Sequence, residues 1–308
     1  MSDSPRRSSV GADILVVAAY EMGQSRRTRL LQVMVVTYAA TTAAAHWAFV
    51  QGLNQAESAA ALTMGVPATS RPGTLTEAAL ESEGLREFLV GVVGSESVLE
   101  RLASAPLLGL WSGVVAMVLL PLFLLFGTSA CVASEVESKS IRFLALRTER
   151  LPIVLGKGLG QLGMAAVAAL AGVLVTEAVG LLLMVEQPPL RLLLTAFEQA
   201  LRALVYALPF AGLGLCVSQW IGRAHAARAV GILALLVIVI GDAVLKAYSS
   251  PQPLGRIADI ARLALPGQGW TEMWETDLGA LAAGASRLMV VTLAWVALGT
   301  LRFDRRDL

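Results

Sequence analysis

Charged side chains are scarce in this chain, since Asp, Glu, Lys and Arg make up 15% of its 308 residues, whereas about 25% is usual in a soluble domain. Hydrophobic residues make up 56%, and the mean hydropathy is +0.68. This balance excludes an ordinary soluble protein. The formal net charge is only +1, so the chain has no excess of basic residues with which to bind nucleic acid.

Cysteine and histidine are rare too, with two of each. Cys131 and Cys216 both lie inside apolar runs, which excludes a disulfide framework or a zinc site built on cysteine. His46 and His225 lie far apart in the sequence, so a histidine-rich metal site and a His-Glu-x-x-His protease are also excluded. We therefore expect no cofactor or metal in this chain.

Catalytic motifs are missing as well. Gly156-Lys157-Gly158 lacks the upstream glycine and the Ser or Thr of a P-loop, so it cannot hold ATP in that way. Ser129 could act as an intramembrane nucleophile with His46 as its base, but a small residue in a span more often lets helices pack closely. The chain is therefore not expected to be an enzyme.

Six apolar runs, each near or above the roughly 20 residues that cross a bilayer, dominate the rest of the chain. They are Leu30–Val50, Pro106–Ala133, Ile153–Val185, Ala200–Trp220, Val230–Tyr248 and Ala282–Leu301. The third run is too long for one perpendicular crossing, so we expect it to be tilted, kinked at Gly172 or extended beyond the membrane at its start. The pattern predicts an all-α integral membrane protein with six transmembrane helices, forming one transmembrane domain over residues 1–308.

The distribution of arginine predicts the orientation of these spans, because basic residues favour the cytoplasmic side. Basic residues precede the first span, fill the link between the second and third spans, flank the link between the fourth and fifth, and close the chain. Residues 51–105 instead hold seven Glu against three Arg. Arg256 and Arg262, in residues 249–281, count mildly against this orientation. We expect a multi-pass protein of the cell inner (plasma) membrane with both termini in the cytoplasm.

Two segments expected in the cytoplasm have helical patterns. Residues 11–29 alternate apolar and charged side chains, which favours an amphipathic helix on the inner membrane surface; an ordinary extension of the first span is the alternative. In residues 134–152, Ile141 and Leu144, together with Ile153 just beyond, could face the bundle on a second amphipathic helix. The side chains facing a cytosolic partner would then be Glu137, Lys139, Arg142 and Arg147. A solvated loop that obeys the positive-inside rule is equally compatible with this composition.

The two segments expected outside also carry local signals. In residues 51–105, Thr74-Leu75-Thr76-Glu77 has the spacing of a capping box and predicts a short helical outer segment between the first two spans. In residues 249–281, Trp270 and Trp274 indicate an interfacial helix or a re-entrant turn at headgroup level.

The link between the second and third spans resembles that of the permease subunits of ABC-2 type exporters. Their link typically reads Glu-x-Glu-x-Gly-Thr-Leu, followed by an apolar turn, Pro, a basic residue, Ile and Leu-Gly-Lys. Here Glu135-Val136-Glu137-Ser138-Lys139-Ser140-Ile141 is similar to the first part, and Arg150, Ile153 and Leu155-Gly156-Lys157 are similar to the second. The chain departs from the pattern at Lys139, where the family has Gly, and at Ser140, where it has Thr.

The resemblance implies a permease subunit that forms the translocation pathway of an exporter, pairs with a second copy in an expected homodimer, and docks on a separate cytosolic ATPase that binds ATP and Mg. The implied coupling residues are Glu135, Glu137, Lys139, Arg142, Arg147, Arg150 and Lys157. We expect Glu135 and Glu137 to anchor the ATPase; capping a helix start is the alternative role. The alternative function is a mechanical transmitter that acts on an extracytoplasmic partner through residues 51–105 without transporting a substrate.

Several ionisable residues lie inside spans, where charges are costly and indicate function by default, and four of them form the group considered for the outer side. They are Glu177, Arg202, Asp242 and Lys246, all expected in the outer half of the membrane. Asp242 and Lys246 are four residues apart and can pair on one helix face, and Glu177 could reach Arg202 across the turn that joins their helices. Either these charges only neutralise one another or snorkel to the interface, or they form a polar outer vestibule for an amphipathic substrate.

Overall fold

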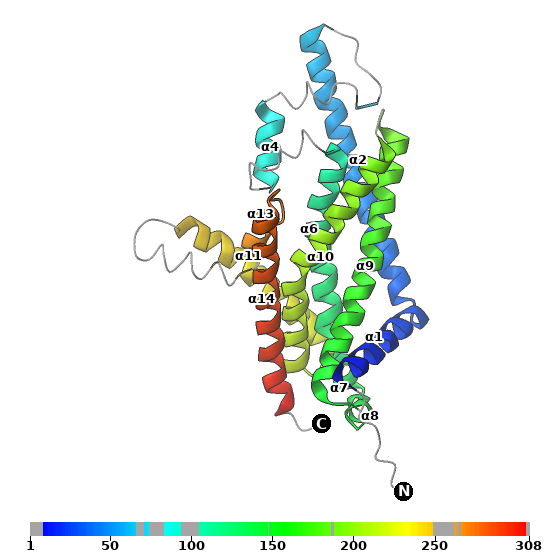
Figure 1. Cartoon of the computed structure of the whole chain (residues 1–308), viewed down its shortest axis with the longest axis vertical. Coiled ribbons are helices and arrows are strands. Elements are labelled where there is room, and N and C mark those ends of the chain that lie inside the picture. The colour runs from blue at the N-terminus through cyan, green and yellow to red at the C-terminus, as the bar shows by residue number, and fades with distance from the viewer. Residues whose placement is uncertain are drawn as a thin grey trace.

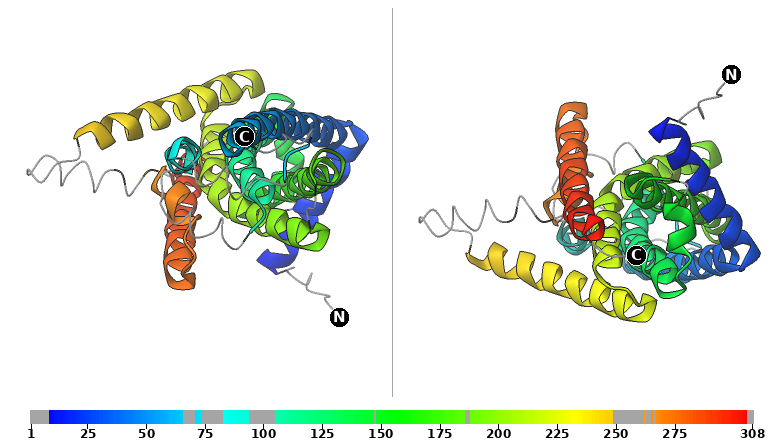
Figure 2. Two further views of the ribbon diagram at one scale, coloured as in Figure 1. Left: turned by 90° about the horizontal axis from the view of Figure 1, so that it is seen from above. Right: turned by 90° about the horizontal axis from the view of Figure 1, so that it is seen from below.

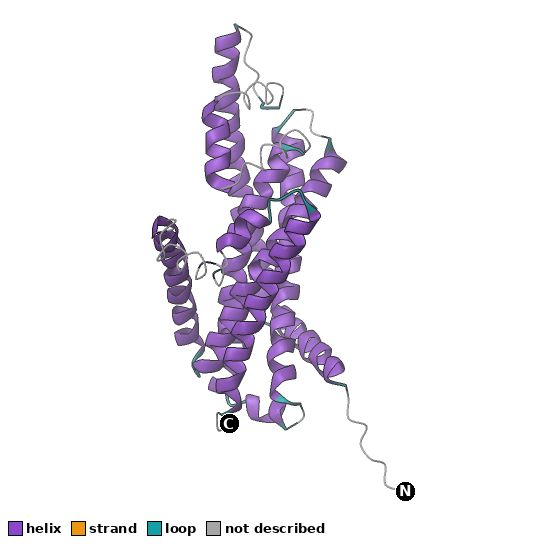
Figure 3. Ribbon diagram, turned by 60° about the vertical axis from the view of Figure 1, so that its left-hand side comes forward, coloured by secondary structure: helices purple, strands orange, loops and turns teal. Residues whose placement is uncertain are grey.

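The computed structural model describes residues 9–65, 71–73, 83–93, 105–146, 148–185, 188–248, 262, 265 and 267–305. Within these ranges all regular structure is helical (Figure 1 and Figure 3). The helices are α1 (Val10–Arg27), α2 (Leu30–Met64), α4 (Glu83–Val93), α6 (Leu107–Cys131), α7 (Ala133–Glu137), α8 (Ile141–Ala145), α9 (Arg150–Leu183), α10 (Pro189–Trp220), α11 (Ala224–Tyr248), α13 (Gly267–Glu272) and α14 (Leu278–Asp304). The predicted all-α class is confirmed.

Six of the described helices are long and apolar enough to cross a membrane: α2, α6 together with α7, α9, α10, α11 and α14. This confirms the predicted number of spans, but the helices extend beyond the apolar runs. α2 has 35 residues, about 50 Å at the helical rise, whereas the hydrocarbon core is roughly 30 Å thick. Its end at Met64 therefore projects from the membrane. The third run lies almost entirely within α9, which has 34 residues and begins at Arg150; whether this span is tilted, kinked at Gly172 or extended beyond the membrane stays a prediction.

α6 and α10 form the centre of the bundle. In the most apolar part of α10, 72% of the residues are buried, whereas the figure for α11 is 6%. Figure 2 shows why: α11 and α14 stand to one side of the group formed by α2, α6, α9 and α10. The core therefore belongs mainly to four spans, and α11 and α14 have large apolar faces that the described part of the chain does not cover.

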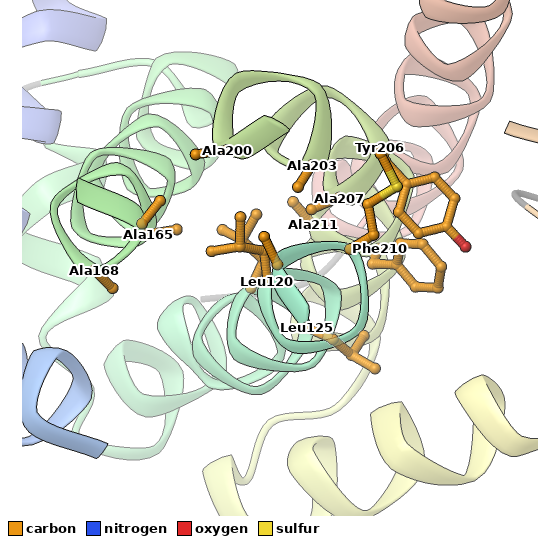
Figure 4. Close-up of a cluster of buried hydrophobic side chains, with 14 of the residues drawn as sticks. Leu120, Leu125, Ala165, Ala168, Ala200, Ala203, Tyr206, Ala207, Phe210 and Ala211 are labelled. Carbon is orange, nitrogen blue, oxygen red and sulfur yellow. The ribbon is translucent and has the colours of Figure 1, made fainter. Parts of the chain in front are cut away.

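Small side chains let the central helices approach closely. Leu120 of α6 lies among Ala165 of α9 and Ala203 of α10, and all three are fully buried (Figure 4). Between helices in lipid, stability comes from such close packing, because lipid chains are as apolar as leucine and give little hydrophobic driving force. The alanine-rich faces of α9 and α10 thus set how closely these spans pack.

α1 packs against the first turns of α9, where glycines leave room for it. A Cβ atom at Gly156 would lie 2.6 Å from Val17 Cβ, and one at Gly160 would lie 2.8 Å from Glu21 Cβ. The helix predicted for residues 11–29 is therefore present; its position on a membrane surface stays a prediction. Large apolar side chains on its opposite face are exposed, namely Leu15, Val16 and Tyr20.

The outer segments are described in part. α4 lies within the predicted outer helical segment, whereas the expected capping box, Thr74 to Glu77, falls outside the described residues. The Gly73 amide donates to both carboxylate oxygens of Glu57, at 3.0 and 3.1 Å. The Val185 amide donates to the Pro72 carbonyl at 2.9 Å. The turn before α4 is thus tied both to the projecting end of α2 and to the end of α9.

Residues 249–281 contain a short helix, α13, and both tryptophans of this segment pack on the bundle. Trp274 is 0% exposed and belongs to the main core. Trp270 is half-buried and stacks edge-on against Tyr206 of α10, with 5.8 Å between ring centroids. The position of this segment at headgroup level stays a prediction, because an aromatic pair flanking a turn can cover a helix bundle at any depth.

We expect Gly156→Ala to loosen α1 from α9, because the new methyl group would lie 2.7 Å from the Ile14 carbonyl oxygen, and overpacking of this kind costs about 1–3 kcal/mol. Hydrogen exchange of residues 10–27 should accelerate about tenfold. Gly163→Ala is the matched control, since the new methyl group would meet only the flexible Met22 side chain. Unchanged protection in Gly156→Ala would mean that the glycines do not set this contact.

Candidate functional site

The link between α6 and α9 contains two short helices, α7 and α8, and a side chain of α10 binds the start of α7. The Ser218 hydroxyl accepts hydrogen bonds from the amides of Val132 and Ala133, both at 2.9 Å. Ser218 is 0% exposed. These amides lie where α6 gives way to α7, so a side chain from another span caps the break in the helix. Of the two alternatives left open for this link, one amphipathic helix or a solvated loop, neither describes it fully, because it contains the two short helices α7 and α8.

A buried ion cluster joins α1, α7 and α9. Lys157 Nζ lies 2.7 Å from Glu21 Oε2 and 3.0 Å from Glu135 Oε1. The Lys157 side chain is 2% exposed, and Gln161 donates to Glu21 Oε1 at 3.0 Å. We call Glu21, Glu135 and Lys157 the ionic junction. A charge removed from water must be paired, so the junction constrains three helices at once.

The sequence indicated two members of the ionic junction but missed the third. Glu135 and Lys157 were predicted as coupling residues, without a contact between them. Glu21 was missed, although a signal exists: it follows Val17 and Ala18 at helical spacing on the buried face of α1. An acidic residue on the apolar face of an amphipathic helix indicates a buried basic partner.

Two further predicted residues hold the ends of other spans. Glu137 Oε2 accepts from the Ala224 amide at 2.9 Å, at the start of α11, where a helix favours negative charge. The Arg150 guanidinium donates to the carbonyls of Phe303 and Asp304 at the end of α14, and lies 5.4 Å from the Phe303 ring centroid. Both residues therefore bind within the chain, and Glu137 takes the capping role that was left open.

The side of α8 away from the bundle is exposed. Ile141 and Ile153 are buried, as predicted, and Leu144 is half-buried. The residues Arg142, Phe143 and Leu146 point outward, with Phe143 74% and Leu146 83% exposed; we call these three the exposed face of α8. The exposed Lys139 between α7 and α8 has a φ of 62°, a region in which glycine is at ease. Arg147 falls outside the described residues.

The predicted pairs among the charges of the outer half are wrong. Arg202 binds Glu198 of its own helix at 2.7 Å and donates to the carbonyls of Met273 and Glu275 at 2.6 and 3.0 Å. The Glu198 pair has i,i+4 spacing and was missed, whereas sequence spacing could not reveal the carbonyl contacts, because the carbonyls after α13 reach Arg202 only when that segment folds back onto α10. The Glu177 carboxylate is half-buried, and its Oε2 has no hydrogen-bond partner among the described residues.

The pair expected on α11 is also replaced. Asp242 accepts from Arg262 at 3.3 Å, and Lys246 is exposed. Arg262, which counted against the predicted orientation, therefore has a structural partner in Asp242. The positive charge of Arg262 is partly neutralised near the end of α11.

The described residues contain neither the Ser129–His46 pair considered from the sequence nor a metal-binding group. Ser129 donates to the Phe126 carbonyl at 3.2 Å, and His46 contacts the Thr42 carbonyl at 2.8 Å and the Thr176 hydroxyl at 3.1 Å. No hydrogen bond joins Ser129 to His46. Within the part of the chain that the structure describes, His, Cys, Asp and Glu nowhere gather in threes in a way that could hold a metal ion.

Comparison with known proteins identifies the family of the chain. A family model described as ABC-2 family transporter protein matches residues 15–308. No curated protein sequence matches the chain. The matched range contains the ionic junction, the exposed face of α8 and the six spans.

Replacing Lys157 with Met should destabilise the protein strongly. The substitution leaves the buried carboxylates of Glu21 and Glu135 without a counter-charge, which typically costs about 3–5 kcal/mol. Thermal unfolding in detergent would measure the loss, with Lys139→Met as the control because Lys139 is an exposed lysine of the same link. Adding Glu21→Gln to Lys157→Met should recover part of the stability. Equal melting temperatures for Lys157→Met and the control Lys139→Met would contradict the ionic junction.

Glu272 provides a pH-dependent contact between α13 and α14. It pairs with Arg287 at 2.7 Å, but burial raises the pKa of Glu272 above its ordinary value of 4.5 by more than Arg287 lowers it. A raised pKa in the folded state means that the contact is strongest below pH 4.5 and weakens as the pH rises through the folded-state pKa.

Glu272→Gln should therefore make the α13–α14 contact stronger than in the unmodified protein at pH 7, and equal to it near pH 4. Hydrogen exchange of residues 267–275 at the two pH values would measure this. Glu149→Gln is the control, since Glu149 is exposed and lies just before α9, away from α13. The interpretation fails if the amides of residues 267–275 exchange faster in Glu272→Gln than in the unmodified protein at pH 7.

Proposed function

Because the chain belongs to the ABC-2 transporter family, as a multi-pass membrane permease of an ABC transporter, we propose that it is the permease subunit of an exporter driven by a separate cytosolic ATPase. ATP and Mg would bind to that partner, and this chain would form the translocation pathway. The observation that carries the proposal is the placement of the exposed face of α8 directly beside the ionic junction. A surface for a partner is thus joined to several spans by short, rigid contacts.

The exposed face of α8 has the composition of a docking surface. Phe143 and Leu146 are large apolar side chains held in water, and Arg142 lies beside them. Aromatic and arginine side chains commonly supply most of the energy of an interface. We propose that these residues contact the ATPase, assisted by Lys139, and that Arg147 lies in the same segment.

Glu135 and Glu137 have a different role in this proposal. Their carboxylates already bind Lys157 and the Ala224 amide, so they would position α7 and α8 and leave the ATPase contact to their neighbours. Movement of α8 would then pass through Glu135 to α9, through Glu137 to α11, and through Arg150 to α14. Rigid helices joined by specific contacts are the physical basis on which such motion is transmitted.

The proposed orientation places α8 in the cytoplasm of a cell with the chain in its inner (plasma) membrane. In its support, α1, α8 and the end of α14 lie at the same end of the bundle (Figure 1), which is the end that carries most of the basic residues. A second copy of the chain would cover part of the exposed apolar surface of α11 or α14. The cytoplasmic position of α8 and the pairing with a second copy both follow the family pattern of paired six-span subunits.

The polar residues at the other end of the bundle would serve the exit of a substrate. Glu177 supplies a half-buried carboxylate with one oxygen unbonded within the described chain, and Lys246 supplies an exposed ammonium group. Arg202 and Asp242 have partners within the chain and would shape the outlet without contacting the substrate. The pathway would suit an amphipathic molecule.

One observation favours the alternative function, a mechanical transmitter acting on an extracytoplasmic partner. α2 projects beyond the membrane and is tied to the turn before α4 through Glu57. A rigid extension joined to a span could transmit force without a substrate crossing. ATP-dependent substrate flux in vesicles separates the two functions, since a transmitter would show none.

We expect Leu146→Asp to lower copurification of the ABC ATPase about tenfold or more, because a charge in the centre of an apolar contact typically costs 2 kcal/mol or above. The measurement is the ATPase activity that copurifies with the tagged full-length chain from its native membrane. Leu62→Asp is the matched control, because Leu62 is also 83% exposed but lies at the far end of α2. Equal ATPase recovery with Leu146→Asp would disprove docking on α8.

A further inference from the structure

A polar pocket lies between the ends of α10 and α14. Its volume is about 280 Å³, and it is lined by Gln219, Trp220, Arg302 and Arg305. Two guanidinium groups thus face a shared space with an amide and an indole. None of these four residues belongs to the ionic junction or to the exposed face of α8.

The pocket results from how α10 and α14 pack. A Cβ atom at Gly212 would lie 2.8 Å from the Thr292 carbonyl oxygen, and one at Gly299 would lie 2.9 Å from Cys216 Cα. The two backbones therefore approach closely between these glycines. Beyond Gly299 both helices reach their last turn, where large side chains replace glycine. The space between those side chains is the pocket.

The charge of the pocket is positive. Arg302 and Arg305 are both exposed, and the four lining residues include no carboxylate. Arg150 approaches from the other side, where it binds the carbonyls of Phe303 and Asp304. Guanidinium groups bind phosphate oxygens through paired hydrogen bonds, so a phosphate is the anion that this geometry suits.

The depth of the pocket points to a lipid as the source of that phosphate. Trp220, at the end of α10, is 52% exposed, and Leu298 and Leu301 on the adjoining turns of α14 are 43% and 63% exposed. Tryptophan favours the headgroup level of a membrane. Apolar side chains thus continue from the pocket along the surface of the span, where acyl chains lie.

We propose that this pocket binds the phosphate headgroup of an anionic phospholipid, with its acyl chains along Leu298 and Leu301. Arg302 and Arg305 bind the phosphate, and Trp220 packs against the glycerol region. Basic pockets between spans are a known means of holding anionic headgroups. The bound lipid bridges α10 and α14 at their ends, beside the contact of Arg150 with α14.

The test is native mass spectrometry of the full-length protein released from vesicles of equal parts phosphatidylglycerol and phosphatidylcholine. The unmodified protein should retain phosphatidylglycerol in preference to phosphatidylcholine. Arg302→Gln with Arg305→Gln should lower that retention roughly 25-fold, about five-fold for each arginine. Arg305 lies just after the last residue of α14, so Arg305→Gln alone should show the five-fold loss without disturbing a helix.

The charge-matched control is Arg26→Gln with Arg27→Gln, which removes two exposed arginines from the last turn of α1. This control should retain phosphatidylglycerol as well as the unmodified protein. An equal loss in both double variants would show general attraction to basic residues and overturn the proposal, as would full retention in the pocket variant. Displacement of the lipid by millimolar inorganic phosphate would also overturn it, because the site would then take a soluble anion.

Discussion

The pairing of Lys157 with Glu21 and Glu135 is the constraint on which the rest of this molecule depends. An ammonium group that is 2% exposed cannot keep its charge without partners, and its partners come from α1 and α7. α1 must therefore lie close to α9, which the glycines at 156 and 160 permit. α7 must fold back beneath the bundle, which Ser218 permits by capping the break after α6.

The link between α6 and α9 is attached to other spans at several points. Glu135 joins α7 to α9, Glu137 joins α7 to α11, and Arg150 at the far end of the link joins α9 to α14. Glu135 pairs with a lysine side chain, whereas Glu137 and Arg150 bind backbone groups at helix ends, where unsatisfied amides and carbonyls are available. A small segment can thereby hold the ends of spans that barely touch one another elsewhere.

Hydrophobicity predicted the six spans because the bilayer selects for it directly. It did not predict that α2 and α10 extend by more than ten residues beyond their apolar runs, since helix continuation depends on backbone hydrogen bonds and packing rather than on apolarity. Glu135 and Lys157 were recognised through their resemblance to a family pattern. The contacts of Arg202 with Met273 and Glu275, and of Asp242 with Arg262, were not, because the approach of those later residues to α10 and α11 is a property of the tertiary fold.

The slight burial of α11 has a consequence for biosynthesis. Its most apolar part has the highest hydropathy among the described spans, 2.4, and the lowest buried share, 6%. Leaving the translocation channel for the bilayer depends on hydrophobicity summed along a single helix. α11 thus enters the lipid on its own apolarity, without waiting for its neighbours. α2, with a hydropathy of 1.4, has much less of this driving force and relies more on the helices that follow it.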